Sequence, residues 1–291
     1  MKKKLITKIK EFWKRFTKVI NRPEMAILPG QLAFFFVLAI VPTITLITMG
    51  ASLLNLSTDL IYNFLARAFS IDIASMLLNT NNTTSGVNLL LLIIIGYYIA
   101  SNGSASIIIT SNTIYGEEQT SFLYRRIKAI VMTFFLVILF IFMLIVPVFG
   151  NTITSLIENV NIAPIITERI ITIFHLLQGP MTWIIIYFFI KLLYTIAPNK
   201  QVKSKSVGYG ALFTSVGWII ATSIYSFYIN NYAHYSTFYG GLASIVVLML
   251  WLYLLAFIFT IGMALNYRKE EEEIEKTATL NLENQKETMK N

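Results

Sequence analysis

Cysteine is absent from the 291-residue chain, and the side chains that most often carry catalysis are rare. The absence of cysteine excludes disulfides, thiolate metal sites and cysteine nucleophiles. There are two histidines, His175 and His234, and two aspartates, Asp59 and Asp72, and the sequence has no H-E-x-x-H, G-x-S-x-G or phosphate-binding glycine-rich motif. We therefore expect no catalytic residues, no metal site and no cofactor, and we do not expect an enzyme.

Charge is also scarce, and long apolar runs take its place. Charged residues make up 13% of the chain, about half of the roughly 25% found in soluble domains, and the mean hydropathy is +0.66. A membrane-spanning helix needs about 20 predominantly apolar residues. The segments that meet this length are Pro29–Leu54, Val87–Ser111, Ile127–Gly150, Ile170–Ala197, Val207–Asn230 and Gly240–Asn266. The sequence therefore predicts an all-α, polytopic membrane helix bundle of about six transmembrane helices within residues 25–267.

The Lys and Arg residues gather in alternate connections between these segments. Residues 1–24 carry nine of them against two Glu. Further groups are Arg125, Arg126 and Lys128 after the second segment and Lys200, Lys203 and Lys205 after the fourth. The positive-inside rule then predicts a multi-pass protein of the cell membrane with both termini in the cytoplasm. Because the basic residues flank apolar spans, the net charge of +8 does not indicate a nucleic-acid partner.

The two ends of the chain differ in character from the predicted membrane domain. Within residues 1–24, apolar side chains repeat at steps of three and four, with lysines on the other face: Leu5, Ile9, Phe12, Trp13, Phe16, Val19 and Ile20. This pattern predicts an amphipathic helix on the inner leaflet that binds anionic membrane lipids. The alternative is a helix packed on the cytoplasmic ends of the bundle. Residues 268–291 are charged and polar, and we expect a disordered cytoplasmic tail.

The second predicted span is unusually polar in its latter half. At about 100° per residue, Asn102, Ser106, Thr110 and Thr113 share one face. The adjoining face is made of small residues: Gly96, Ala100, Gly103, Ser104 and Ser111. One interpretation is a tightly packed central helix whose hydroxyls bond across helices. The other is the polar wall of a cavity, with a local helix break at Asn102–Gly103. Both interpretations remain open at this stage.

Lys191 is the one Lys or Arg well inside a predicted span, seven residues before Pro198. Its position near the inner end lets the side chain snorkel to the interface. Alternatively, it is a contact for an anionic headgroup.

A series of short motifs gives the chain a family resemblance. They are Tyr194-Thr-Ile-Ala-Pro-Asn-Lys200, Val207-Gly-Tyr-Gly-Ala-Leu-Phe-Thr-Ser-Val-Gly-Trp218, Tyr225-Ser-Phe-Tyr-Ile-Asn-Asn-Tyr232, Tyr239-Gly-Gly-Leu-Ala-Ser244 and Leu250-Trp-Leu-Tyr253. Their ordered combination resembles the YihY/BrkB family of bacterial inner-membrane proteins, which was formerly labelled ribonuclease BN. Two features depart from the family pattern: Ala264 stands where an acidic residue is usual, and residues 117–121 lack the arginine usual after the Tyr-Gly turn.

The resemblance implies a six-helix inner-membrane protein, and the residues argue against the ribonuclease label because they contain no recognisable nuclease site. We expect a transporter or flippase-like protein for a lipid or envelope component. The alternative is a non-transporting membrane scaffold for envelope biogenesis. The sequence does not indicate an oligomeric state.

Overall fold

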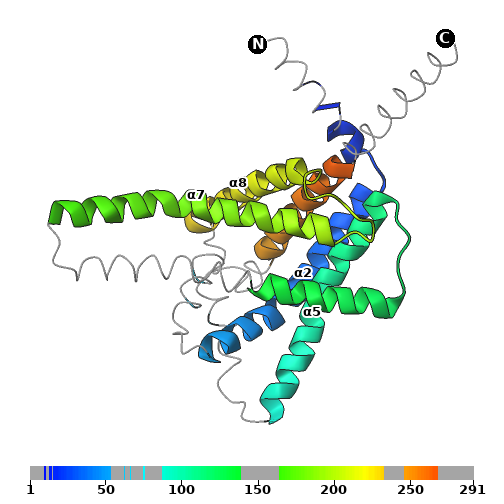
Figure 1. The fold of residues 1–291 in the computed structure, drawn as a ribbon, viewed down its shortest axis with the longest axis horizontal. Coiled ribbons are helices and arrows are strands. Elements are labelled where there is room, and N and C mark those ends of the chain that lie inside the picture. The colour runs from blue at the N-terminus through cyan, green and yellow to red at the C-terminus, as the bar shows by residue number, and fades with distance from the viewer. Residues whose placement is uncertain are drawn as a thin grey trace, which may run out of the picture.

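The computed structural model describes residues 10, 13, 14, 16–53, 62, 66, 75, 87–138, 164–232 and 246–267, and the regular structure among them is helical (Figure 1). The labelled helices are α2 (Glu24–Leu53), α5 (Val87–Tyr115), α7 (Pro164–Ile196) and α8 (Gly208–Tyr232). Two more helices cover residues 122–138 and Val246–Tyr267. A helix therefore lies in each of the six segments that the sequence predicts, and the all-α membrane-bundle class is confirmed.

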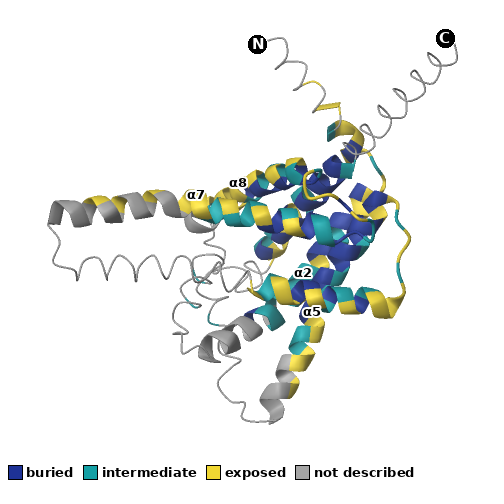
Figure 2. Cartoon of the chain, in the orientation of Figure 1, coloured by how far each residue is buried: buried dark blue, intermediate teal, exposed yellow. Residues whose placement is uncertain are grey.

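Three of these helices, within the part of the chain that the structure describes, have the length and composition of membrane spans. They are Gly179–Ile196, Gly208–Tyr228 and Val246–Tyr267, with mean hydropathies of 1.5, 1.3 and 2.5. Figure 2 shows which residues of the bundle are exposed, and many of them are large and apolar, among them Ile27, Phe188 and Leu176. Exposed side chains of this kind suit hydrocarbon better than water.

Helix α5 ends at a glycine that reverses the chain. Gly116 has a φ of 67°, a conformation that glycine adopts without steric cost. The amide of Gly116 donates to the carbonyl of Thr113, and the amide of Glu117 donates to the carbonyl of Asn112. This is the Schellman pattern that satisfies the last carbonyls of a helix. The chain therefore turns sharply at residue 116 and runs back beside α5.

The small-residue face of α5 packs on α2. A Cβ added to Gly103 would lie 3.5 Å from the Cβ of Ala39, and one added to Gly96 would lie 3.6 Å from the Cβ of Pro42. Such separations are ordinary van der Waals contact, so the two backbones approach closely at both glycines. The prediction of close helix approach on this face is confirmed.

Helix α8 and helix Val246–Tyr267 are in still closer contact. A Cβ on Gly210 would lie 2.0 Å from the carbonyl oxygen of Gly262. Asn266 accepts a 2.7 Å hydrogen bond from the amide of Gly210, one of the amides that a helix leaves unpaired in its first turn. Two glycines and one amide side chain therefore fix this crossing.

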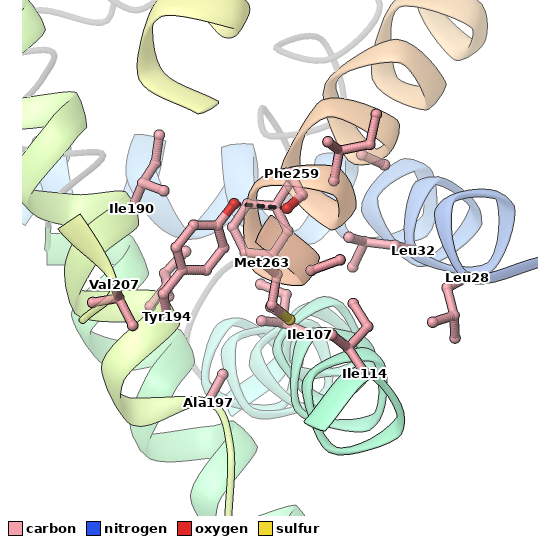
Figure 3. Packing of buried hydrophobic residues seen from close by; sticks show 14 of the residues in the cluster. Leu28, Leu32, Ile107, Ile114, Ile190, Tyr194, Ala197, Val207, Phe259 and Met263 are labelled. Carbon is pink, nitrogen blue, oxygen red and sulfur yellow. Dashed lines mark hydrogen bonds between the residues drawn. The ribbon is translucent and has the colours of Figure 1, made fainter. Parts of the chain in front are cut away.

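The core lies where α2, α5, α7 and helix Val246–Tyr267 meet, as Figure 3 shows. The Tyr194 hydroxyl from α7 donates a 2.6 Å hydrogen bond to the carbonyl of Phe259. The Thr214 hydroxyl of α8 lies 2.7 Å from the same tyrosine oxygen. Both Tyr194 and Phe259 are fully buried, together with Leu32 of α2. The polar end of Tyr194 is therefore satisfied inside an otherwise apolar cluster.

Candidate functional site

Helix 122–138 lies across the middle of α5 and brings a cation to it (Figure 1). The returning segment is held along α5 by Gln119, whose amide donates to the carbonyl of Ile109. Arg126 then lies beside Asn102, 13 residues before the end of α5, which corresponds to about 20 Å along the helix axis. A simple hairpin would instead have placed Arg126 at the C-terminal end of α5.

The guanidinium of Arg126 contacts two residues of α5. Nη1 donates a 2.7 Å hydrogen bond to Oδ1 of Asn102, and Nη2 donates one to the backbone carbonyl of Tyr98. The guanidinium carbon lies 3.5 Å from the centroid of the Tyr98 ring, a short cation–π contact. The side chain is 9% exposed, and its buried Nε has no hydrogen-bond partner.

All of these contacts of Arg126 are to neutral groups. Neighbouring Arg125 is more exposed than Arg126. Its side chain is half-buried, and its Nη1 donates a hydrogen bond to the carbonyl of Thr120 in the connection between α5 and helix 122–138. A buried cation costs several kcal/mol unless an anion or several hydrogen bonds compensate it. Arg126 is therefore a buried cation, among the residues that the structure describes, that an anion would stabilise.

The four polar residues predicted on one face of α5 are in three different environments. Asn102 is half-buried and bonded to Arg126. Ser106 and Thr110 are buried, and neither hydroxyl has a hydrogen-bond partner. Thr113 is exposed and donates to the carbonyl of Ile109 on its own helix. Their role in lining a cavity stays a prediction.

Ser111, on the adjoining face, resembles Ser106 and Thr110 in being fully buried with an unpartnered hydroxyl. Ser104 differs, because its hydroxyl lies 2.7 Å from that of Thr133 on helix 122–138. Thr133 donates its own proton to the carbonyl of Ala129, so Ser104 is the donor of the pair. Helix α5 thus carries both satisfied and unsatisfied hydroxyls.

The helix break considered at Asn102–Gly103 is absent. Helix α5 is continuous from Val87 to Tyr115. The physical reason is that Gly103 packs against Ala39 and Phe36 of α2. The absence of a side chain at Gly103 therefore allows α2 to approach closely, and α5 does not unwind there. The polar residues of α5 therefore lie on an intact helix.

Lys191 lies on α7, half-buried, with its ammonium 5.9 Å from the centroid of the Phe188 ring. This distance is at the outer limit of a cation–π contact. The role of Lys191 as a headgroup contact therefore stays a prediction.

The amphipathic pattern at the N-terminus is divided between the bundle and the exterior. Val19 is fully buried, and the ring of Phe16 lies 6.2 Å from that of Phe213 on α8. Trp13 and Ile20 are exposed, as are Lys10 and Lys14. One side of this segment thus packs on the bundle, while an apolar and basic side remains open. Residues 1–9 and the predicted tail 268–291 lie outside the described residues.

Within the described residues, no three His, Asp or Glu side chains come close enough to hold a metal ion. His175 lies on α7, and His234, Asp59 and Asp72 lie outside the described residues.

The fold and composition together define an integral membrane protein of helical class. Comparison with known families agrees, because the model of the family described as virulence factor BrkB matches residues 16–287. The chain belongs to this family.

Individual relatives extend the comparison. The ribonuclease-like protein YfkH of Bacillus subtilis is 31% identical over 264 residues, covering 89% of this chain and 93% of the relative. A UPF0761 membrane protein of Idiomarina loihiensis is 33% identical over 89 residues, about 31% of each chain. One of Pseudoalteromonas translucida is 32% identical over 97 residues, covering 33% of this chain and 32% of the relative. No solved structure matches the chain. Two of these three names describe membrane proteins, and the third describes a ribonuclease-like protein.

Sequence reasoning missed Arg126 as a residue of the site. The Arg125–Arg126 pair has the pattern of ordinary positive-inside charges, and the third span was predicted to begin after it, at Ile127. One signal was available: helical spacing places Arg126 on the same side as Ala129 and Thr133, which are buried, and opposite exposed Tyr124 and Val131.

Proposed function

We propose that the protein moves an anionic lipid or lipid-linked envelope component across the cytoplasmic membrane, with both termini in the cytoplasm. The observation that supports this proposal is the set of unpartnered hydroxyls of Ser106, Thr110 and Ser111, buried on the central helix α5. Each such group costs about 1–3 kcal/mol relative to a satisfied one. A polar cargo that passes beside α5 would supply the missing partners.

The contrast within α5 strengthens this interpretation. Ser104 is paired with Thr133, and Thr113 with its own backbone. The hydroxyls of Ser104 and Thr113 therefore both have hydrogen-bond partners within the protein. The unpartnered hydroxyls lie between these two residues, so they form a distinct group along the helix.

Two basic features are proposed to attract the anionic end of the cargo. Lys191 on α7 is half-buried, and its ammonium lies 5.9 Å from the centroid of the Phe188 ring. The exposed Lys10 and Lys14 beside Trp13 would hold anionic lipid at the inner leaflet. In this proposal the protein's partners are anionic membrane lipids, and nucleic acid is not among them.

A non-transporting scaffold is the second candidate. It is favoured by the Ser104–Thr133 pair and by the bond from Arg126 to Asn102. In both cases a protein group is the hydrogen-bond partner of a polar side chain on α5. A scaffold would use α5 for packing alone and would leave lipid distribution unchanged.

A lipid-translocation assay separates the two candidates. Purified protein is reconstituted into vesicles of phosphatidylethanolamine and phosphatidylglycerol that contain fluorescent phosphatidylglycerol, and dithionite quenches the outer leaflet. Transport predicts quenching beyond the outer-leaflet half, at a rate that increases with the amount of protein. Quenching that stops at the level of protein-free vesicles would contradict transport and favour the scaffold.

A further inference from the structure

We infer that Arg126 is a binding site for a phosphate group, held ready inside the bundle by Asn102 and Tyr98. The inference rests on the proposed function, because it names the chemical group by which the cargo is recognised. The ligand class is a phosphate monoester or diester, as in a phospholipid headgroup, and inorganic phosphate shares the same recognition chemistry.

The charge of Arg126 suits an anionic ligand. Arg126 is 9% exposed, and its contacts are the Asn102 side chain and the backbone carbonyl and ring of Tyr98. These groups are dipoles or π-faces, so among the residues that the structure describes the positive charge has no neutralising partner. A charged side chain at membrane depth carries a large desolvation cost. A bound anion would return that cost as an attractive interaction in a medium of low polarity.

The guanidinium of Arg126 also has unused donor capacity. An arginine has five N–H groups in a planar fork, and two hydrogen bonds from Arg126 to the protein are present. Nε is buried and unpartnered. Planar forks bind phosphate oxygens in pairs, which is why arginine is favoured at phosphate sites.

The position of Arg126 beside the polar face of α5 also suits a phosphate site. Asn102 lies on the helical face that continues through Ser106 and Thr110, whose hydroxyls also have no partners. A phosphate at Arg126 would therefore lie at one end of the same polar face. Because the guanidinium is buried, entry of the anion requires Arg126 to exchange a contact with Asn102 or Tyr98 for a phosphate oxygen.

A purely structural role for Arg126 makes a different prediction. Its two hydrogen bonds and its contact with the Tyr98 ring, which join helix 122–138 to α5, would then be its whole contribution. A phosphate would add nothing to the stability of the folded protein. Ligand-dependent stabilisation therefore separates the two roles, whereas loss of stability on mutation alone does not.

The test uses thermal unfolding of the purified full chain in detergent, titrated with phosphatidylglycerol, with diacylglycerol of the same chains, or with inorganic phosphate. The variants are Arg126→Gln and, as the matched control, Arg125→Gln. Arg125 is the adjacent residue, and its side chain is half-buried, so the control removes the same charge at a more exposed position. We expect phosphatidylglycerol to raise the midpoint of the wild-type protein and diacylglycerol to leave it unchanged. Apparent affinity should fall at least tenfold in Arg126→Gln and less than threefold in Arg125→Gln.

The outcomes are decisive in each arm. Stabilisation by phosphatidylglycerol but not by inorganic phosphate assigns the site to a lipid headgroup, and Arg126-dependent stabilisation by inorganic phosphate assigns it to the free anion. Failure of both probes to stabilise the wild-type protein overturns the inference, as does equal affinity in Arg126→Gln. If Arg126→Gln does not fold, Arg126→Lys decides, because it keeps the charge and loses the fork. At least threefold weaker binding is then expected, and unchanged binding overturns the site.

The site and the transport function fail separately. Arg126-dependent binding without lipid translocation would leave the phosphate site standing and contradict transport. Translocation by a protein whose Arg126→Gln variant binds and transports normally would leave transport standing and contradict the site.

Discussion

The ammonium of Lys128 lies at the end of α7, where it donates a 2.8 Å hydrogen bond to the carbonyl oxygen of Ala197 and a 2.9 Å bond to that of Pro198. Carbonyls at a helix C-terminus lack intrahelical partners and carry partial negative charge. Lys128 therefore caps α7 from helix 122–138. Asn199 follows Pro198, and its backbone amide donates a 2.9 Å hydrogen bond to the Oδ1 atom of Asn112 on α5. One end of the bundle is thus joined by groups from three helices.

Replacing Lys128 by methionine should loosen this end of the bundle. The change keeps the length of the side chain and removes the donor to the two carbonyls, so we expect a loss of about 1–3 kcal/mol in the free energy of unfolding. Denaturant unfolding in detergent measures it. Lys203→Met is the control, because Lys203 is exposed in the connection that follows. Equal stability of the two variants would contradict the capping role.

Gly210→Ala should be strongly destabilising. The added Cβ would lie 2.0 Å from the carbonyl oxygen of Gly262 and 2.6 Å from the amide of Asn266, so α8 and helix Val246–Tyr267 would have to separate. We expect a loss of at least about 2–3 kcal/mol, at the upper end of overpacking effects.

The matched control for that change is Gly30→Ala on α2, where an added Cβ meets nothing within 4 Å. Alanine is the better helix former, so this variant should be unchanged or more stable by up to about 1 kcal/mol. Thermal midpoints of the two purified variants provide the comparison, and similar midpoints would show that the two helices do not cross at Gly210.

The hydroxyl pair of Ser104 and Thr133 should be measurable by a double-mutant cycle. Ser104→Ala, Thr133→Val and the double variant isolate the coupling between side chains that lie 2.7 Å apart. Hydrogen bonds between helices in membrane proteins contribute about 0.6 kcal/mol on average and up to about 1.7 kcal/mol. We expect a favourable coupling in this range because both residues are buried. Strict additivity would mean that the two helices do not meet at this pair.

The positions of the helices were largely predictable because length and hydropathy carry that information. Segment Val87–Ser111 became α5 with the same first residue, and its end moved only to Tyr115, where Gly116 reverses the chain. Gly96 and Gly103 also predicted a close helix neighbour, although the identity of that neighbour, α2, depends on tertiary contacts.

The candidate site was only half predictable, for a physical reason. Asn102 was found from helical periodicity, but its partner Arg126 belongs to a charge pair typical of an inner-side loop. What moved Arg126 to the middle of α5 is the return of residues 116–121 along that helix, held by Gln119. No local pattern encodes this path, since it arises from contacts between residues that the hydropathy profile treats as a simple loop.

Thr110→Val tests whether the unpartnered hydroxyls serve transport. Valine has nearly the same shape and removes a buried hydroxyl without a partner, so we expect the free energy of unfolding to stay the same or rise by about 1 kcal/mol. The transport rate should fall, because the cargo loses a polar contact. Thr113→Val is the control, since Thr113 is exposed and bonded to its own helix.

The decisive measurement for transport is the rate of phosphatidylglycerol translocation in proteoliposomes, compared between wild-type protein, Thr110→Val and Thr113→Val at equal protein content. We expect translocation above that of protein-free vesicles for the wild-type protein and Thr113→Val, and at least a fivefold lower rate for a fully folded Thr110→Val. A wild-type rate equal to that of protein-free vesicles, or an undiminished rate in Thr110→Val, would contradict it.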